Sequence, residues 1–311
     1  GNDTGGSVAE AELSQENHEQ INYDLESFVL QDLTPDLQKE DSGLISFRVQ
    51  TEKLNLSLSN EGGGSLKEVV LVSSVEDGHK YLGGYDSNDI YQDSINVSLI
   101  LNETTCSPCL SSYDGGEETF FDLPFNIISP KIQNHERFVL SGEDSLVISM
   151  SAAVGGSVIN KRTTYYGNSY LIKHAYDVLP GPSSVSNYKD FNFSWFGGIR
   201  NTEKDRAFET SQYTQAYLAQ NKSIEDFYIT PEAGDVYRSV DFHGKTDWAA
   251  IRNKYFIMAL VPKAPVAASH ASSAFMLKKE TLVPSFSASI NSINSSTLDC
   301  DVFLGPLDVD E

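Results

Sequence analysis

Cys106 and Cys109 are the residues whose type and spacing point most directly to chemistry, because they form a Cys-Ser-Pro-Cys motif. Cysteines at this spacing occur in redox pairs and in zinc knuckles, and both uses require a thiolate of lowered pKa. A redox pair of this kind opens a helix, whereas the polar residues 110–116 that follow here predict a loop. Three alternatives remain open: a catalytic or metal-binding pair, a local loop disulfide in an oxidising compartment, or two inert thiols.

The other candidate ligands are scattered along the chain. Cys300 stands alone, so zinc has no second cysteine pair and three cysteines make no complete disulfide framework. The histidines show no HxH or HExxH spacing; they lie at positions 18, 79, 135, 174, 243 and 270. His174 is interpreted as a hydrogen-bonded structural residue of a strand. The competing hypothesis pairs a histidine with a glutamate as general acid and base on a sugar ring.

No nucleotide or nucleophile motif is present, since the sequence contains no P-loop, no GxSxG elbow and no GxGxxG before a helix. No catalytic residue, metal ligand or cofactor is therefore assigned. Several aromatic residues could line a ligand cleft, although an aromatic side chain in a strand is more often part of the core. These residues are Tyr165, Tyr166, Trp195, Phe196, Tyr217 and Tyr255.

Composition limits the partners of the chain. Its 311 residues include 44 acidic against 22 basic side chains, a formal net charge of −22. Nucleic acid is excluded as a partner because no basic cluster is present to replace counterions on phosphates. The same charge opposes self-association and predicts a monomer. A hydrophobic content of 40% suits a globular core, and no apolar run reaches the roughly 18 residues of a membrane-spanning helix.

Two regions of different composition predict the domain organisation. Residues 1–43 are acidic, amide-rich and without sustained apolar periodicity, which predicts a flexible linker. Residues 44–311 contain short alternating apolar runs broken by Gly, Asn, Asp and Ser, which are typical of strands. The opening runs, 45–49, 54–58 and 66–72, flank a glycine turn at 61–65. Helical spacing is confined to 207–219 and to a turn or two at 248–253, with Asp247 as a possible cap.

Further strands are expected along the rest of the chain, at 95–101, 122–127, 137–140, 146–150, 158–166, 170–178, 191–195, 227–229, 255–261, 273–277, 285–290 and 297–304. A dozen or more strands with few short helices and no βα alternation predict an all-β fold of packed antiparallel sheets. The expected architecture is a large β-sandwich.

Three segments together resemble the large periplasmic domain of bacterial YidC-type membrane protein insertases. They are the hairpin at 49–67, the segment 248–262 and the Val-Phe-Leu-Gly-Pro sequence at 302–306. Their order and separation also fit that family, whereas residues 73–120 have no clear counterpart. The motif residues, interpreted as structural, are Gly62, Gly63, Trp248, Tyr255, Phe256, Pro262, Gly305 and Pro306.

The resemblance implies a β-supersandwich of the galactose mutarotase-like type, tethered at the periplasmic face of the inner membrane. It implies that residues 1–43 follow a transmembrane helix absent from this chain, and that the helices performing insertion would follow residue 311. The expected role is a non-enzymatic scaffold contacting Sec translocon accessory proteins and nascent membrane proteins. Two alternatives are a mutarotase-like sugar-processing enzyme and a secreted glycan-binding sandwich, because a fold alone does not decide function.

Overall fold

The computed structural model describes residues 43–73, 81–101, 106–114, 117–154, 157–179, 191–227, 237–264, 266–278, 281–292 and 296–307. These residues belong to a compact unit that spans residues 40–311. The linker predicted for the N-terminal region lies outside the described residues, apart from its final position.

The smaller sheet contains five strands in the order β10-β1-β2-β3-β6. Its strands are β1 (Ser46–Gln50), β2 (Leu54–Ser59), β3 (Ser65–Leu71), β6 (Ser98–Ile100) and β10 (Glu136–Val139). Leu54, Leu56 and Leu58 are buried in β2 while Asn55 is exposed, which is the two-residue alternation of a sheet with one face on the core. The predicted hairpin with its glycine turn is thereby confirmed, and β1 pairs with β10 in parallel.

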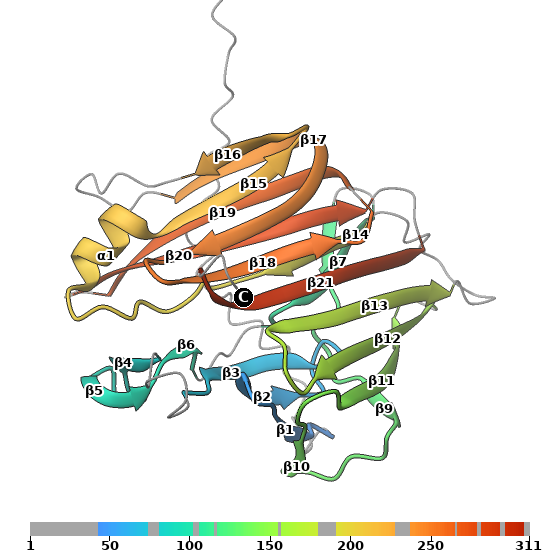
Figure 1. The fold of residues 1–311 in the computed structure, drawn as a ribbon. Helices are drawn as coiled ribbons and strands as arrows, with labels where there is room; N and C mark the ends of the chain where they lie inside the picture. Colours follow the sequence, from blue (N-terminus) through green and yellow to red (C-terminus); the bar gives the residue numbers. More distant parts are fainter. Residues whose placement is uncertain are drawn as a thin grey trace, which may run out of the picture. The chain divides into compact units, whose positions relative to one another are not determined.

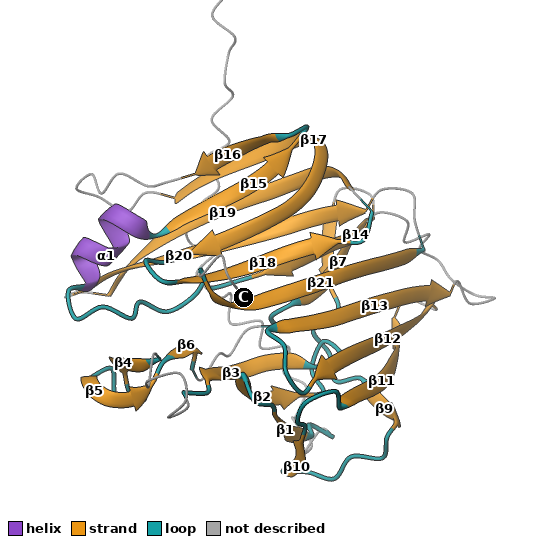
Figure 2. Cartoon of the chain, in the orientation of Figure 1, coloured by secondary structure: helices purple, strands orange, loops and turns teal. Residues whose placement is uncertain are grey.

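The larger sheet contains fourteen strands and follows the order β8-β7-β14-β20-β19-β17-β18-β21-β13-β12-β11-β9, with β15 and β16 added beside β17. The strands are β7 (Cys109–Asp114), β8 (Glu117–Phe120), β9 (Asn126–Ser129), β11 (Ser145–Val154), β12 (Ser157–Tyr166), β13 (Leu171–Leu179), β14 (Phe191–Trp195), β15 (Gln215–Gln220), β16 (Ser223–Phe227), β17 (Tyr237–Arg252), β18 (Phe256–Pro262), β19 (Val266–Lys278), β20 (Thr281–Ser292) and β21 (Thr297–Pro306). A separate hairpin joins β4 (Leu82–Tyr85) to β5 (Tyr91–Asn96). Figures 1 and 2 show these strands as arrows.

The segment 248–253, predicted as a short helix, instead forms the end of β17 up to Arg252, and Asn253 begins the following turn. The first part of this long strand pairs with β19, and its last residues pair with β15 on one side and β18 on the other. Ala249, Ala250 and Ile251 are all fully buried, so this part of the strand is covered on both faces. Consecutive burial removes the alternation that marks a half-exposed strand, which is why the segment resembled a helix turn.

The predicted helix at 207–219 is shorter than expected. Helix α1 (Arg206–Tyr213) begins after Asp205, whose side chain accepts a hydrogen bond from the backbone of Phe208. The chain then enters β15, where Ala216 and Leu218 are buried against β17. Pairing with β17 therefore overrides the helical spacing of the second half of this segment.

The prediction of a loop after the Cys-Ser-Pro-Cys motif was also wrong, because strand β7 begins at Cys109. This strand pairs with β14 and β8, and Leu110, Ser111 and Ser112 are fully or almost fully buried. The hydroxyl of Ser111 donates to the carboxylate of Glu118 at 2.6 Å. Small polar residues can therefore lie inside this sheet because a neighbouring strand supplies their hydrogen-bond partner.

One apolar core unites the two sheets. Buried side chains from the smaller sheet, such as Leu56 and Val69, belong to the same cluster as Ile159, Phe193 and Val302 of the larger sheet. The predicted all-β antiparallel sandwich with little helix is confirmed. Among the described residues, no helix is both long enough and apolar enough to cross a membrane.

Candidate functional site

A cleft of about 550 Å³ lies beside the turn between β17 and β18. Its walls come from the β4–β5 hairpin, the loop before α1, the β17–β18 turn and the end of β21. The lining residues are Tyr81, Leu82, Gly83, Tyr91, Val97, Thr202, Glu203, Lys254, Tyr255, Phe256, Pro306 and Leu307. Three of the family-motif residues, Tyr255, Phe256 and Pro306, are thus brought together here.

Asn253 fixes the turn that presents two of these residues. Its side-chain oxygen accepts hydrogen bonds from the backbone N–H groups of Tyr255, at 3.0 Å, and Phe256, at 2.8 Å. Its amide group donates to the carbonyl of Arg200 at 2.9 Å, which ties the turn to the loop before α1. Asn253 is fully buried, and the hydrogen bonds of its side chain fix the positions of Tyr255 and Phe256 in the cleft.

Replacing Asn253 by alanine is expected to lower the free energy of unfolding by about 2 to 3 kcal/mol, because buried donors and an acceptor lose their partner. Urea unfolding of the purified chain measures this loss. The matched control is Asn134→Ala, since Asn134 is exposed and accepts a single bond from the backbone of Ser46. The control is expected to cost less than about 1 kcal/mol, and equal losses in both variants would contradict the assigned role.

An ion pair occupies one wall of the cleft. The same carboxylate oxygen of Glu203 accepts from the Lys254 ammonium at 2.7 Å and from the Tyr255 hydroxyl at 2.6 Å. These two bonds hold the pKa of Glu203 below its ordinary value, and the bond that Lys254 donates to Glu203 raises the pKa of Lys254. Glu203 is therefore ionised at neutral pH and acts as an acceptor rather than as a proton donor.

The β4–β5 hairpin is held to the loop before α1 by charged and aromatic contacts. The Arg200 guanidinium donates to the carbonyls of Tyr85, at 2.8 Å, and Asp86, at 3.3 Å. Arg206 forms a two-bond ion pair with Asp89, and its guanidinium lies 3.4 Å from the centre of the Tyr85 ring. A planar guanidinium can stack and bond at the same time, so these contacts give the cleft wall a fixed position.

The floor of the cleft is aromatic. The Tyr81 and Phe256 rings meet edge to face with centroids 6.1 Å apart. Gly305 precedes the lining residue Pro306, and a Cβ atom there would come within 2.8 Å of the Tyr170 ring. Tyr255 is 47% exposed, so an aromatic surface remains available in the cleft. The cleft therefore combines apolar surface with a fixed ion pair, the usual composition of a site that binds other molecules.

The remaining motif residues lie elsewhere. Trp248 pairs with Ala219 within the sheet, and Pro262 lies opposite Cys300, at the other end of the β18–β21 pairing from Phe256 and Pro306. These positions support the sheet rather than the cleft.

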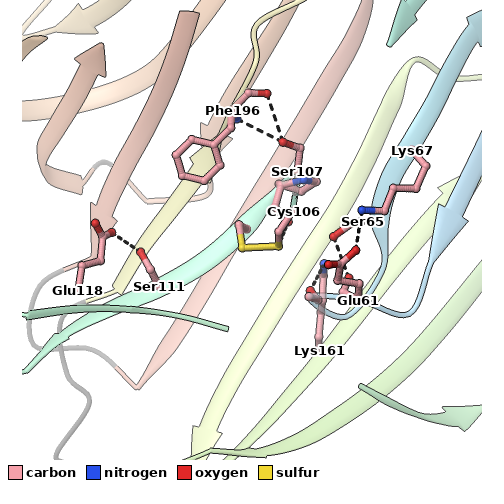
Figure 3. Close-up of a disulfide and its surroundings, with 12 residues drawn as sticks. Glu61, Ser65, Lys67, Cys106, Ser107, Ser111, Glu118, Lys161 and Phe196 are labelled. Carbon is pink, nitrogen blue, oxygen red and sulfur yellow. Dashed lines mark hydrogen bonds and ion pairs between the residues drawn. A yellow bond between two sulfur atoms is a disulfide. The ribbon is translucent and has the colours of Figure 1, made fainter. Parts of the chain in front are cut away.

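Gly62 and Gly63 lie in the turn between β2 and β3. Figure 3 shows Glu61, which precedes them, near Cys106 of the disulfide. Both glycines have positive φ angles, and a Cβ atom on Gly62 would lie 2.4 Å from the sulfur of Cys106. Cys106 and Cys109 form a disulfide in the structure and are buried. In this bonded form neither sulfur is a thiolate, so neither can act as a nucleophile or a metal ligand.

The histidine and glutamate of the sugar-chemistry hypothesis are not brought together in the described part of the cleft. His174 is buried in the interior on β13, whereas Glu203 lines the cleft and is paired with Lys254. Of the aromatic candidates, Tyr255 lines the cleft, and Tyr165 and Trp195 are core residues. Asn253, Glu203 and Lys254 were not predicted as site residues from the sequence, although Asn253 and Lys254 lie inside the 248–262 motif.

A second hollow of about 410 Å³ lies over β9, β11, β12, β13 and β21. Its lining mixes polar and apolar side chains and includes Asn160, Lys161, Arg162, Tyr176, Asp177 and Asp299. It contains none of the motif residues. The described residues also include no group of three or more His, Cys, Asp or Glu side chains placed to hold a metal ion.

Comparison with solved structures finds similar folds at very low sequence identity. A galactose mutarotase related enzyme from Lactobacillus acidophilus has a TM-score of 0.43 and 7% identity, covering 84% of this chain and 97% of that chain. An alpha-galactosidase from Lactobacillus brevis has a TM-score of 0.40 and 8% identity, covering 85% of this chain and 39% of that chain. These likenesses concern the fold alone.

Comparison of sequences finds insertase relatives. The chain is 28% identical over 218 residues to the membrane protein insertase YidC of Chlorobaculum parvum, covering 69% of this chain and 33% of that protein. It is 30% identical over 158 residues to the protein of the same name from Chlorobium phaeovibrioides, covering 47% of this chain and 25% of that protein. The chain thus spans about a third or less of the length of these relatives.

The model of the YidC periplasmic domain family matches residues 131–311, more than half of the chain. This match covers every motif residue of the cleft and two of the three resembling segments, 248–262 and 302–306, and it confirms the resemblance to this family. The chain belongs to the YidC periplasmic domain family.

Proposed function

We propose that this chain is the periplasmic domain of a membrane protein insertase and supports the insertion and folding of inner-membrane proteins through contacts with partners or clients. The observation that carries this proposal is the family match over residues 131–311, together with relatives that are named membrane protein insertases. Insertion itself would be performed by helices outside this chain.

The cleft at Tyr255 is proposed as the contact site. Aromatic rings and Leu82 offer apolar surface, while Glu203 and Lys254 already neutralise each other. Such a lining suits an extended polypeptide segment with apolar side chains, since the segment buries surface without disturbing an unpaired charge. The proposed occupants are nascent membrane proteins or Sec translocon accessory proteins.

The chain is proposed to act without catalytic chemistry. The cleft carboxylate, Glu203, is held in its ionised form by two hydrogen bonds, and His174 lies in the interior of the sandwich. A general acid needs a pKa near the working pH and access to the substrate, and neither described group meets both needs. Polarimetry on an aldose tests this directly, because a rate of mutarotation above that of buffer would contradict a non-enzymatic role.

The expected location is the periplasmic face of the bacterial inner membrane, with residues 1–43 as the tether. A net charge of −22 disfavours close contact with anionic lipid headgroups, so the domain is proposed to lie away from the bilayer surface. The same charge opposes self-association, so the domain is proposed to be a monomer. Capture of purified translocon components on the immobilised chain tests the partner role. Enrichment over an unrelated immobilised protein of equal net charge supports the proposal, and equal recovery on both counts against it.

A further inference from the structure

The inner faces of β12 and β13 carry a cluster of polar side chains within the apolar core. Lys161 and Thr163 on β12 lie opposite Tyr176 and His174 on β13 in the strand register. All four side chains are at most 3% exposed. The ring of Phe193 covers the cluster, with its centroid 5.6 Å from that of His174 and 5.8 Å from that of Tyr176. These four residues are called the interior polar cluster.

Most polar atoms of the interior polar cluster have no hydrogen-bond partner among the described residues. They are the hydroxyl oxygens of Thr163 and Tyr176 and both ring nitrogens of His174. The Lys161 ammonium donates one long hydrogen bond, 3.4 Å to the carbonyl of Gly62, and lies 5.0 Å from the centroid of the Tyr176 ring. Since more than about 90% of buried polar groups are hydrogen-bonded in folded proteins, a bridging species is expected among these atoms.

The hydrogen-bond donors and the positive charge of the interior polar cluster indicate that the bridging species is an anion. Lys161 offers up to three N–H donors, Thr163 and Tyr176 each offer a hydroxyl, and a neutral His174 offers one N–H. Burial lowers the pKa of Lys161 to about 7, and no described carboxylate lies close enough to offset this effect. The positive charge of Lys161 is therefore not compensated by the described residues. Water could accept the hydrogen bonds but would leave the ammonium without a counter-charge, which is costly for a side chain that is only 1% exposed.

We propose that the interior polar cluster binds a small inorganic anion of about the size of chloride. The anion accepts hydrogen bonds from Lys161, Thr163, Tyr176 and His174 and balances the charge of Lys161. Its position between two strands and the Gly62 turn makes it part of the folded core. It therefore stabilises the folded chain and is released on unfolding.

Thermal unfolding in sodium chloride and in sodium gluconate of equal ionic strength tests this proposal, in slightly acidic buffer where Lys161 is protonated. Chloride is expected to raise the Tm of the wild-type chain by about 2 to 4 °C over gluconate, because a ligand that binds only the folded state shifts unfolding upward. Lys161→Met is expected to give the same Tm in both salts. The control Lys173→Met, on the opposite face of β13, is expected to keep the wild-type difference.

Crystals of the wild-type chain soaked in bromide provide a measurement that needs no variant to fold. The expected result is an anomalous peak within about 3.5 Å of the Lys161 nitrogen, the distance of a hydrogen-bonded halide. The absence of a peak at that position, or a wild-type Tm that is the same in both salts, overturns the proposal and leaves water as the only occupant.

Discussion

Replacing Gly62 by alanine is expected to lower the free energy of unfolding by about 3 to 5 kcal/mol, one of the largest losses for a single methyl group in this chain. Two effects add. The φ angle of +58° at Gly62 is unfavourable for any residue with a Cβ atom. The new methyl group would also lie 2.4 Å from the Cys106 sulfur, which cannot move aside because it is bonded to Cys109.

The matched control for this substitution is Gly142→Ala. Gly142 has a φ angle of +50° but no atom within 4 Å of an added Cβ, so it carries the backbone penalty without the overlap. Its substitution is expected to cost about 1 kcal/mol. Urea unfolding of the two variants separates the contributions, and a Gly62 variant that loses no more stability than the control would show that the turn does not pack as described.

Replacing Lys161 by methionine is expected to stabilise the chain in chloride-free buffer by about 3 to 5 kcal/mol below pH 7, because a buried ammonium is costly. The lysine stem is packed over Gly63 and next to Phe125, and methionine can fill much of that space. In the folded chain the pKa of Lys161 falls from 10.5 to about 7.

The pH dependence of this gain follows from the direction of the shift. Between about pH 7 and pH 10.5 the unfolded chain binds a proton at Lys161 that the folded chain does not, so wild-type stability rises with pH. The advantage of Lys161→Met is therefore greatest below pH 7 and shrinks toward zero near pH 10.5. Urea unfolding across this range measures it. An advantage that is constant with pH would contradict the buried charge.

Much of the fold could be predicted from local sequence. The alternation of Leu54, Leu56 and Leu58 and the glycine run at 62–64 specify a hairpin without reference to the rest of the chain. Segments that are buried on both faces could not be recognised in this way. Ala249, Ala250 and Ile251 carry no alternation, and the buried serines after Cys109 resemble a loop because their partners come from distant strands.

The site was predictable only in part. Tyr255, Phe256 and Pro306 stood out through the family resemblance, and the structure places them in one cleft. The pairing of Glu203 with Lys254 joins residues 51 positions apart, so no spacing rule indicates it. The burial of Lys161 depends equally on tertiary packing, since an Asn-Lys-Arg sequence within a strand would ordinarily face solvent.

Site-specific photocrosslinking in the full-length insertase tests the central claim most directly. A photoreactive phenylalanine analogue at Tyr255 samples the cleft, and the same analogue at Val158, which is exposed on the outer face of β12, is the control. We expect adducts with nascent inner-membrane proteins or with Sec translocon subunits at Tyr255 and none above background at Val158. Equal yields at both positions, or no adducts at Tyr255, would contradict a client or partner role for the cleft.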